Sequence, residues 1–96
     1  SASYGGLYVP ESLPVLDTHF LEKHLGSHYK TLAADFLQIF GIDIDPSTIA
    51  QALDRYDAFD DPSNPVPLKQ IEEDCFVSEL YHGQTRAFKD MALQPF

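Results

Sequence analysis

The strongest structural signal in the chain is a helical pattern of apolar residues between His28 and Phe40. Apolar side chains recur there at steps of three and four, which places them on one face of a helix. They are Tyr29, Leu32, Ala33, Phe36, Leu37 and Phe40. Ser27 is suited to cap the start of this helix, and Gly41 is suited to end it. A stripe of this width is typical of a helix that packs on one side, so we expect a core helix.

A second helix is predicted from Pro46 to about Tyr56 or Phe59. Asp45 offers a carboxylate at the cap, and Pro46 fits the first helical position, where its missing N–H costs nothing. The apolar residues of this helix have the same helical spacing: Ile49, Ala52, Leu53 and Tyr56. Because only a short connector separates the two helices, we expect an antiparallel or crossed pair.

The remaining segments are shorter. A helix of about two turns is expected over residues 17–25, and a short extended segment over Leu7–Val9. Three prolines make residues 60–67 a loop. One helical turn is expected over Leu68–Ile71, and a strand over Cys75–Leu80. The fold class is therefore mainly α, or α+β at most, with about three to four helices and one or two short strands.

The composition is that of a folded and acidic domain. The 96 residues include 15 acidic and 6 basic side chains, for a formal charge of -9, which opposes sequence-independent binding to nucleic acid or anionic membranes. No apolar run approaches the ~20 residues that span a bilayer, and no signal-peptide pattern is visible. We expect a cytoplasmic protein. Cys75 is the only cysteine, and we expect it to be a buried small apolar residue.

No metal site is expected. His24 and His28 have the spacing of a helical metal pair, but Gly26 and the expected cap at Ser27 interrupt the helix between them, and a third ligand is missing nearby. The acidic run at residues 72–74 is typical of a solvated loop.

The segment before the C-terminal end carries the most functional information. Gly83 permits a tight turn, and Thr85 can cap a helix that opens at Ala87. Lys89 is then expected in the first helical turn, where the helix N-terminus and Arg86 both disfavour a cation. A lysine whose neutral amine is favoured can form a Schiff base with a carbonyl compound.

This segment resembles the lysine motif of threonine synthases, which depend on pyridoxal 5'-phosphate. The family pattern is roughly Glu-Leu-Phe-His-Gly-Pro-Thr-x-Ala-Phe-Lys-Asp, and residues 79–90 read Glu-Leu-Tyr-His-Gly-Gln-Thr-Arg-Ala-Phe-Lys-Asp. Gln84 replaces the usual proline, and Arg86 replaces a small or apolar residue. Residues 5–10, Gly-Gly-Leu-Tyr-Val-Pro, are similar to an N-terminal signature of the same family. The two motifs lie at opposite ends of the chain, so the resemblance covers nearly all of it.

The resemblance implies an enzyme that converts O-phospho-L-homoserine and water to L-threonine and phosphate. Lys89 matches the catalytic lysine that holds the cofactor, and Phe88 is expected to pack near the cofactor ring. His82 and Thr85 are candidates for contacts with substrate or cofactor. The alternative for these two residues is that they close the turn by hydrogen bonds.

The resemblance also implies a division of the chain. Residues 1–74 correspond to the N-terminal helical domain, and residues 75–96 to the start of the cofactor-binding catalytic domain. The family's phosphate-binding loop follows the lysine, so we expect the 96-residue chain to be inactive alone and to bind the cofactor weakly. Its expected partners are the substrate, the rest of the enzyme chain and, for an unpaired 75–96 segment, a second copy.

Two alternatives remain at this point. One is a threonine-synthase-like phospho-lyase that yields a keto acid, which the departures at Gln84 and Arg86 leave open. The other is a stand-alone acidic helical interaction module without catalysis.

Overall fold

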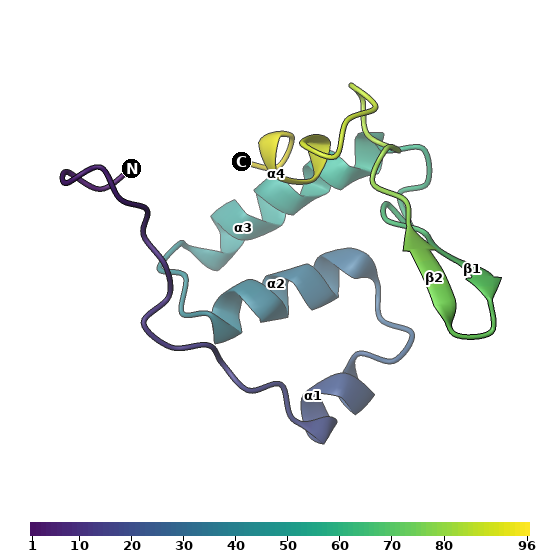
Figure 1. Ribbon diagram of the computed structural model, residues 1–96, viewed down its shortest axis with the longest axis horizontal. Helices are drawn as coiled ribbons and strands as arrows, with labels where there is room; N and C mark the ends of the chain where they lie inside the picture. Colours follow the sequence, from purple (N-terminus) through teal and green to yellow (C-terminus); the bar gives the residue numbers. More distant parts are fainter.

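Two helices that lie side by side and run in opposite directions form the centre of the molecule (Figure 1). They are α2 (Tyr29–Ile39) and α3 (Pro46–Leu53), and the 3-10 helix η1 (Asp54–Ala58) continues α3. The other elements are α1 (Thr18–Lys23), β1 (Leu68–Glu72), β2 (Cys75–Ser78) and α4 (Asp90–Leu93). This computed structural model describes every residue from 1 to 96. It confirms the expected fold class, a small helical domain with two short strands.

The start of α3 is formed by the residues that predicted it. Asp45 Oδ2 accepts hydrogen bonds from the backbone N–H groups of Ser47 at 3.0 Å and Thr48 at 3.3 Å, and from the Ser47 hydroxyl. These bonds, chiefly that from the Ser47 hydroxyl, hold the pKa of Asp45 below its usual value. Pro46 occupies the first helical position as expected, and Asp17 caps α1 in a similar way.

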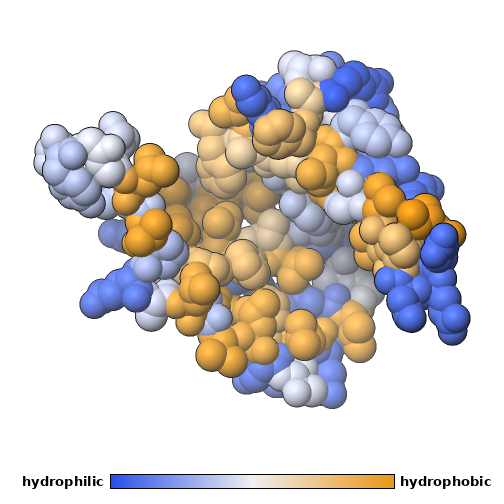
Figure 2. Space-filling model, viewed as in Figure 1, coloured by the Kyte–Doolittle hydropathy of each residue, from blue (hydrophilic) through white to orange (hydrophobic).

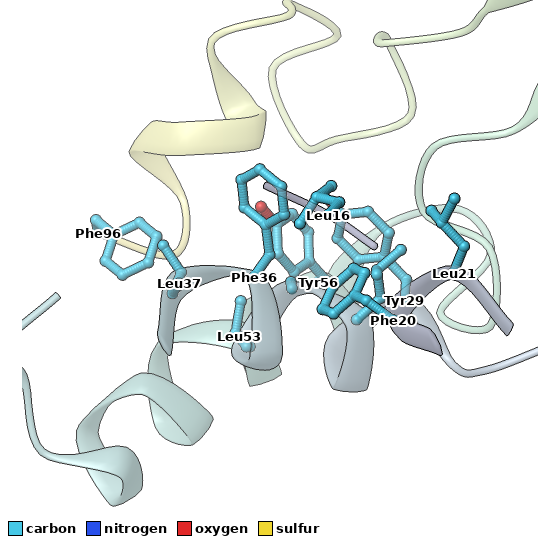
Figure 3. Close-up of a pocket in the computed structure, with 11 residues that line it drawn as sticks. Leu16, Phe20, Leu21, Tyr29, Phe36, Leu37, Leu53, Tyr56 and Phe96 are labelled. Atoms are coloured by element: carbon cyan, nitrogen blue, oxygen red, sulfur yellow. The ribbon is translucent and has the colours of Figure 1, made fainter. Parts of the chain in front are cut away.

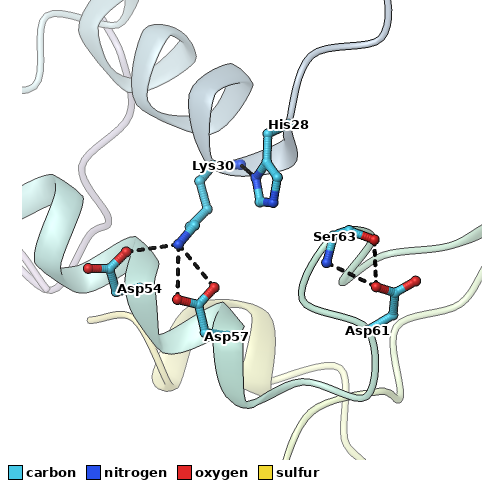
Figure 4. A network of polar contacts seen from close by, with 6 residues as sticks. All are labelled: His28, Lys30, Asp54, Asp57, Asp61 and Ser63. Carbon is cyan, nitrogen blue, oxygen red and sulfur yellow. Dashed lines mark hydrogen bonds and ion pairs between the residues drawn. The ribbon is translucent and has the colours of Figure 1, made fainter.

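The start of α2 differs from the prediction. The helix begins at Tyr29, and its cap is His28, whose Nδ1 accepts a hydrogen bond from the Lys30 N–H at 3.2 Å (Figure 4). The Ser27 hydroxyl donates instead to the Lys23 carbonyl at 3.4 Å. The predicted cap at Ser27 is wrong because this side chain satisfies a carbonyl at the end of α1.

The core lies between α2, α3 and η1. Its buried members are Ile49, Leu53, Tyr56 and Phe59. The Tyr56 ring makes edge-to-face contacts with Tyr29 and Phe59, with centroids 5.1 Å apart in both pairs. Burial raises the pKa of Tyr56, and its hydroxyl donates to the Met91 carbonyl at 2.5 Å. The C-terminal helix α4 is thereby attached to the core.

The two strands form an antiparallel hairpin in which Leu68 pairs with Ser78. The strand predicted at Cys75 is confirmed, although it ends at Ser78. The helical turn predicted over Leu68–Ile71 is wrong, because a two-residue turn brings β2 back alongside this segment and backbone pairing decides its conformation. Every hairpin side chain is exposed, so Cys75 is exposed too and not buried as expected.

The N-terminal segment has no regular structure before Thr18. Residues Leu7–Val9, expected to be extended and β-prone, do not form a strand, since the only sheet in the chain is the β1–β2 hairpin. Their side chains are almost fully solvent-exposed, with Tyr8 at 81%.

The molecule exposes more surface than a closed domain of its size. Its accessible area is 7411 Å², against about 5500 Å² for a compact monomer of the same mass. Its radius of gyration is 15.3 Å, against about 12.5 Å for a compact domain of this length. Figure 2 shows apolar side chains gathered around a hollow on the viewed face. Much of the apolar surface is therefore exposed, and another part of a protein could pack on it.

The hollow contains an apolar groove of about 490 Å³. Side chains of α1, α2, α3 and η1 converge on it, together with Leu16 just before α1 and the C-terminal Phe96 (Figure 3). All eleven lining residues are hydrophobic: Leu16, Phe20, Leu21, Tyr29, Leu32, Ala33, Phe36, Leu37, Leu53, Tyr56 and Phe96. None of the helices has the length and apolar character needed to cross a membrane.

Candidate functional site

The lysine segment, residues 79–90, consists of the loop that connects β2 to α4 and of Asp90, the first residue of α4. The helix predicted to open at Ala87 begins at Asp90, so Lys89 lies at its N-cap position and not in its first turn. No side chain caps this helix. Thr85, the predicted cap, forms hydrogen bonds with the Asp90 side chain instead, which delays the start of the helix.

Asp90 is the buried centre of this loop, with 2% of its surface exposed. Its carboxylate accepts the Thr85 hydroxyl at 2.7 Å, the Thr85 N–H at 2.8 Å and the Gln94 side-chain amide at 3.3 Å. These bonds, chiefly that from the Thr85 hydroxyl, hold the pKa of Asp90 below its usual value. Gly83 lies so close that a Cβ atom on it would overlap the Asp90 side chain. A glycine is therefore required at position 83 by close approach.

His82 forms a second polar centre, in which it lies between two carboxylates. Its Nδ1 is 2.9 Å from Asp60 Oδ2, and its Nε2 is 2.9 Å from Glu79 Oε1. The hydrogen bond to Asp60, followed by that to Glu79, raises the pKa of His82. The pKa of Glu79 is lowered, chiefly by its hydrogen bond to His82. We call the group of Asp60, Glu79, His82 and Arg86 the His82 cluster.

Arg86 completes the His82 cluster. Its guanidinium donates a hydrogen bond to Asp60 Oδ2. This bond, followed by the bond to His82, lowers the pKa of Asp60. The Arg86 backbone has a φ of 61°, in the left-handed region that side-chain-bearing residues rarely adopt. Asp60 also donates its backbone N–H to the His82 carbonyl at 3.1 Å. The loop is thus joined to the end of η1 by side chains and backbone.

Lys89 and Phe88 extend into solvent at the end of this loop. Phe88 is 66% exposed, and the Lys89 side chain takes part in none of the ion pairs of the chain. An accessible primary amine that no carboxylate holds fits covalent attachment of a carbonyl compound such as pyridoxal 5'-phosphate. The roles of Lys89 and Phe88 stay predictions.

His82 and Thr85 both form hydrogen bonds that fold the loop, which is the alternative considered for them from the sequence. Their contacts with substrate or cofactor stay predictions.

Sequence reasoning missed the partners of His82. Asp60 lies 22 residues before His82 in the chain, and its only local signal was an acidic, proline-rich loop.

Other polar contacts connect the helices. Lys30 on α2 binds Asp54 at 2.9 Å and Asp57 at 3.0 Å on η1 (Figure 4). His24 Nε2 lies 3.1 Å from Asp35 Oδ2, while His28 caps α2, so the two histidines serve different contacts. No group of three or more His, Cys, Asp or Glu side chains is placed to hold a metal ion.

Comparisons with known proteins match this chain to one family. A family model for the N terminus of threonine synthase matches residues 1–56. The threonine synthase of Pseudomonas aeruginosa is 38% identical over 97 residues, covering 97% of this chain and 20% of the relative. That of Schizosaccharomyces pombe is 32% identical over 96 residues, covering 97% and 18%. The threonine synthase-like 2 protein of Mus musculus is 34% identical over 91 residues, covering 93% and 19%.

The chain therefore spans about a fifth of the length of the curated relatives it matches. No solved structure matches it at a significant level.

Proposed function

The chain belongs to the threonine synthase family, and we propose that it is the N-terminal part of an enzyme that converts O-phospho-L-homoserine and water to L-threonine and phosphate. The observation that carries this proposal is the match of relatives across nearly the whole chain, including the lysine segment. Pyridoxal 5'-phosphate, when bound, supplies the electron sink for this chemistry. In this proposal Lys89 holds the cofactor and exchanges protons with the substrate, and Phe88 packs near the cofactor ring.

The site geometry supports this role for Lys89. Its side chain is exposed, while contacts hold the chain on both sides of it. Before Lys89, the Arg86 guanidinium binds Asp60, and after it, the Asp90 carboxylate accepts the Thr85 N–H. A reactive amine on a fixed backbone has the orientation that covalent catalysis requires. Asp90 supports the loop from within, since its carboxylate is buried and already occupied by three hydrogen bonds.

The apolar groove supports the proposal that this chain packs against further parts of the enzyme. Its lining is entirely hydrophobic, and Phe96 lies in that lining. An exposed apolar surface of this extent is typical of a face that another part of a protein covers. We propose that residues 1–74 form a helical domain beside the catalytic domain that residues 75–96 begin, that the 96-residue chain is inactive alone, and that the enzyme is cytoplasmic.

A phospho-lyase that releases phosphate and a keto acid is the second candidate. Arg86 favours it, because this departure from the family motif has an unusual backbone conformation and lies three residues before Lys89. Its guanidinium is bound to Asp60, which fixes the Arg86 side chain within the loop that carries Lys89.

The test begins with the reading frame beyond Phe96 and the protein that it encodes. With O-phospho-L-homoserine and pyridoxal 5'-phosphate, we expect phosphate and threonine in equal amounts. The Lys89→Ala variant should lose turnover, while the matched Lys69→Ala variant should retain it. Phosphate with a keto acid would establish the phospho-lyase. A stop codon after Phe96 with no turnover would overturn both candidates in favour of the interaction module.

A further inference from the structure

We propose that His82 is a positioning residue for Lys89, and that its protonated imidazole clips the lysine segment onto the end of η1. The inference rests on the proposed function, because it concerns the placement of the proposed cofactor lysine. It adds a pH-dependent contact between Asp60, which follows η1 in the chain, and the loop that carries the lysine.

The argument begins with the hydrogen-bonding capacity of the imidazole. Both ring nitrogens of His82 lie 2.9 Å from a carboxylate oxygen, one of Asp60 and one of Glu79. An ionised carboxylate can only accept hydrogen bonds, and a neutral imidazole has a single N–H to donate. Only the imidazolium satisfies both partners, so deprotonation must leave one contact unmade.

The charged and titratable groups around His82 agree with a protonated ring. Asp60 and Glu79 are in direct contact with it, and the Tyr81 ring packs on it with centroids 4.6 Å apart. The other two charged groups are Arg86, which binds Asp60, and Lys69 on β1, which acts on Glu79. Neither cation contacts the imidazole: Arg86 forms an ion pair with Asp60, and Lys69 acts on Glu79 through its charge alone.

The clip is connected to Lys89 through a short length of backbone. Asp60 binds both His82 and Arg86, and Arg86 is three residues before Lys89. The left-handed backbone of Arg86 is unfavourable for a residue with a side chain, so it persists while its contacts hold it. The Asp60 N–H bond to the His82 carbonyl belongs to the same contact region. When His82 loses its proton, one of its two carboxylate contacts is lost, and the loop on the N-terminal side of Lys89 is held less firmly, with the Arg86–Asp60 pair still in place.

The direction of the pH dependence follows from the shifted groups. The pKa of His82 is raised, so its contribution is complete below about pH 6.5, the unfolded value, and is lost as the pH rises through the folded value. The pKa values of Asp60 and Glu79 are lowered, so their contributions are present above about pH 4.5 and are lost as the pH falls further. The clip is therefore closed from about pH 4.5 up to the raised pKa of His82, and it opens as the pH rises through that pKa.

The test uses the 96-residue chain and nuclear magnetic resonance. We expect the His82 ring to titrate at a higher pH than in the same chain unfolded in urea. We also expect the protection factor of the Asp60 amide, which donates to the His82 carbonyl, to fall as the ring loses its proton. His82→Gln should remove that pH dependence, and His19→Gln, at an exposed histidine outside the cluster, should leave it unchanged.

Two results would overturn the clip: a His82 titration at or below the unfolded value, or Asp60 protection that does not change with pH. Both are measured on the unsubstituted chain, so they do not depend on whether the variant folds. Labelling with pyridoxal 5'-phosphate and borohydride separates this proposal from the proposed function. If the clip titrates as expected but Lys89 is labelled no more than Lys69, the clip stands and the cofactor role fails. Preferential labelling without a titrating clip gives the reverse conclusion.

Discussion

The helical half of the molecule, residues 18–59, and the lysine-bearing half, residues 60–96, are held together by different forces. In the helical half, four buried apolar residues from α3 and its extension pack against α2. In the lysine-bearing half, the side chains that hold the lysine segment are polar: Asp90 with its three donors, and His82 between two carboxylates. Apolar packing is insensitive to pH, whereas contacts of this polar kind depend on protonation. The same chain thus has one half whose structure is set by packing and another that responds to solution conditions.

The largest effect is expected from Leu53→Ala, which removes apolar packing from the helical half. Leu53 is 3% exposed and belongs to the core cluster of only four buried residues. Truncation of such a side chain lowers the free energy of unfolding by about 2–5 kcal/mol. Urea denaturation followed by circular dichroism measures the loss. The control is Leu25→Ala, at a site 80% exposed, and an equal loss in both variants would show that the core does not hold this half.

A smaller and more local effect is expected from Gly83→Ala. The added Cβ overlaps the Asp90 side chain, and overpacking of this kind costs about 1–3 kcal/mol. The amide protection of Thr85 should fall, while amides of α2 keep theirs. Gln84→Ala is the control, because its side chain is exposed beside the same turn. Unchanged Thr85 protection in Gly83→Ala would mean that the close approach to Asp90 does not hold the loop.

The same division explains what the sequence could predict. The start of α3 was predicted correctly because Asp45 and Pro46 act on their immediate neighbours. The stripe of α2 was visible because helical packing repeats every three to four residues. By contrast, Asp60 meets His82 across 22 residues, and no local pattern encodes such a meeting.

The errors have the same origin. The Leu68–Ile71 segment became a strand because β2 pairs with it. The helix expected at Ala87 began three residues later, because Thr85 bonds to Asp90 and leaves Lys89 at the cap position. The lysine motif itself could be recognised in the sequence, but the tertiary contacts that position it could not be predicted. These contacts depend on the fold as a whole.

Tyr56→Phe probes the bond that joins the two halves. The Tyr56 hydroxyl donates to the Met91 carbonyl at 2.5 Å, while its ring packs in the core. Removing the hydroxyl keeps the ring and costs about 0.5–1.5 kcal/mol. Amide exchange should show loosening confined to α4, with the core amides unchanged. Tyr8→Phe, at a site 81% exposed, is the matched control. A uniform loss over both halves would contradict a local link.

The smallest effect is expected from Lys30→Met, which removes a polar contact from the half that packing dominates. Lys30 binds Asp54 and Asp57 at the surface, and these hydrogen bonds, chiefly that to Asp54, raise its pKa. A raised pKa means that the contribution is complete at neutral pH and is lost only as the pH rises through the folded value. Exposed ion pairs contribute little and are screened by salt. Thermal unfolding at low and high ionic strength should therefore show a small loss that shrinks with salt.

Arg55→Met is the control for this last measurement, because Arg55 is exposed on η1 and takes part in none of the ion pairs. It removes the same charge without removing the contact. A salt-dependent loss in Lys30→Met that Arg55→Met does not share assigns the effect to the pairs with Asp54 and Asp57. A loss in Lys30→Met as large as that in Leu53→Ala would contradict the comparison, since a surface ion pair would then hold the helical half as strongly as its core.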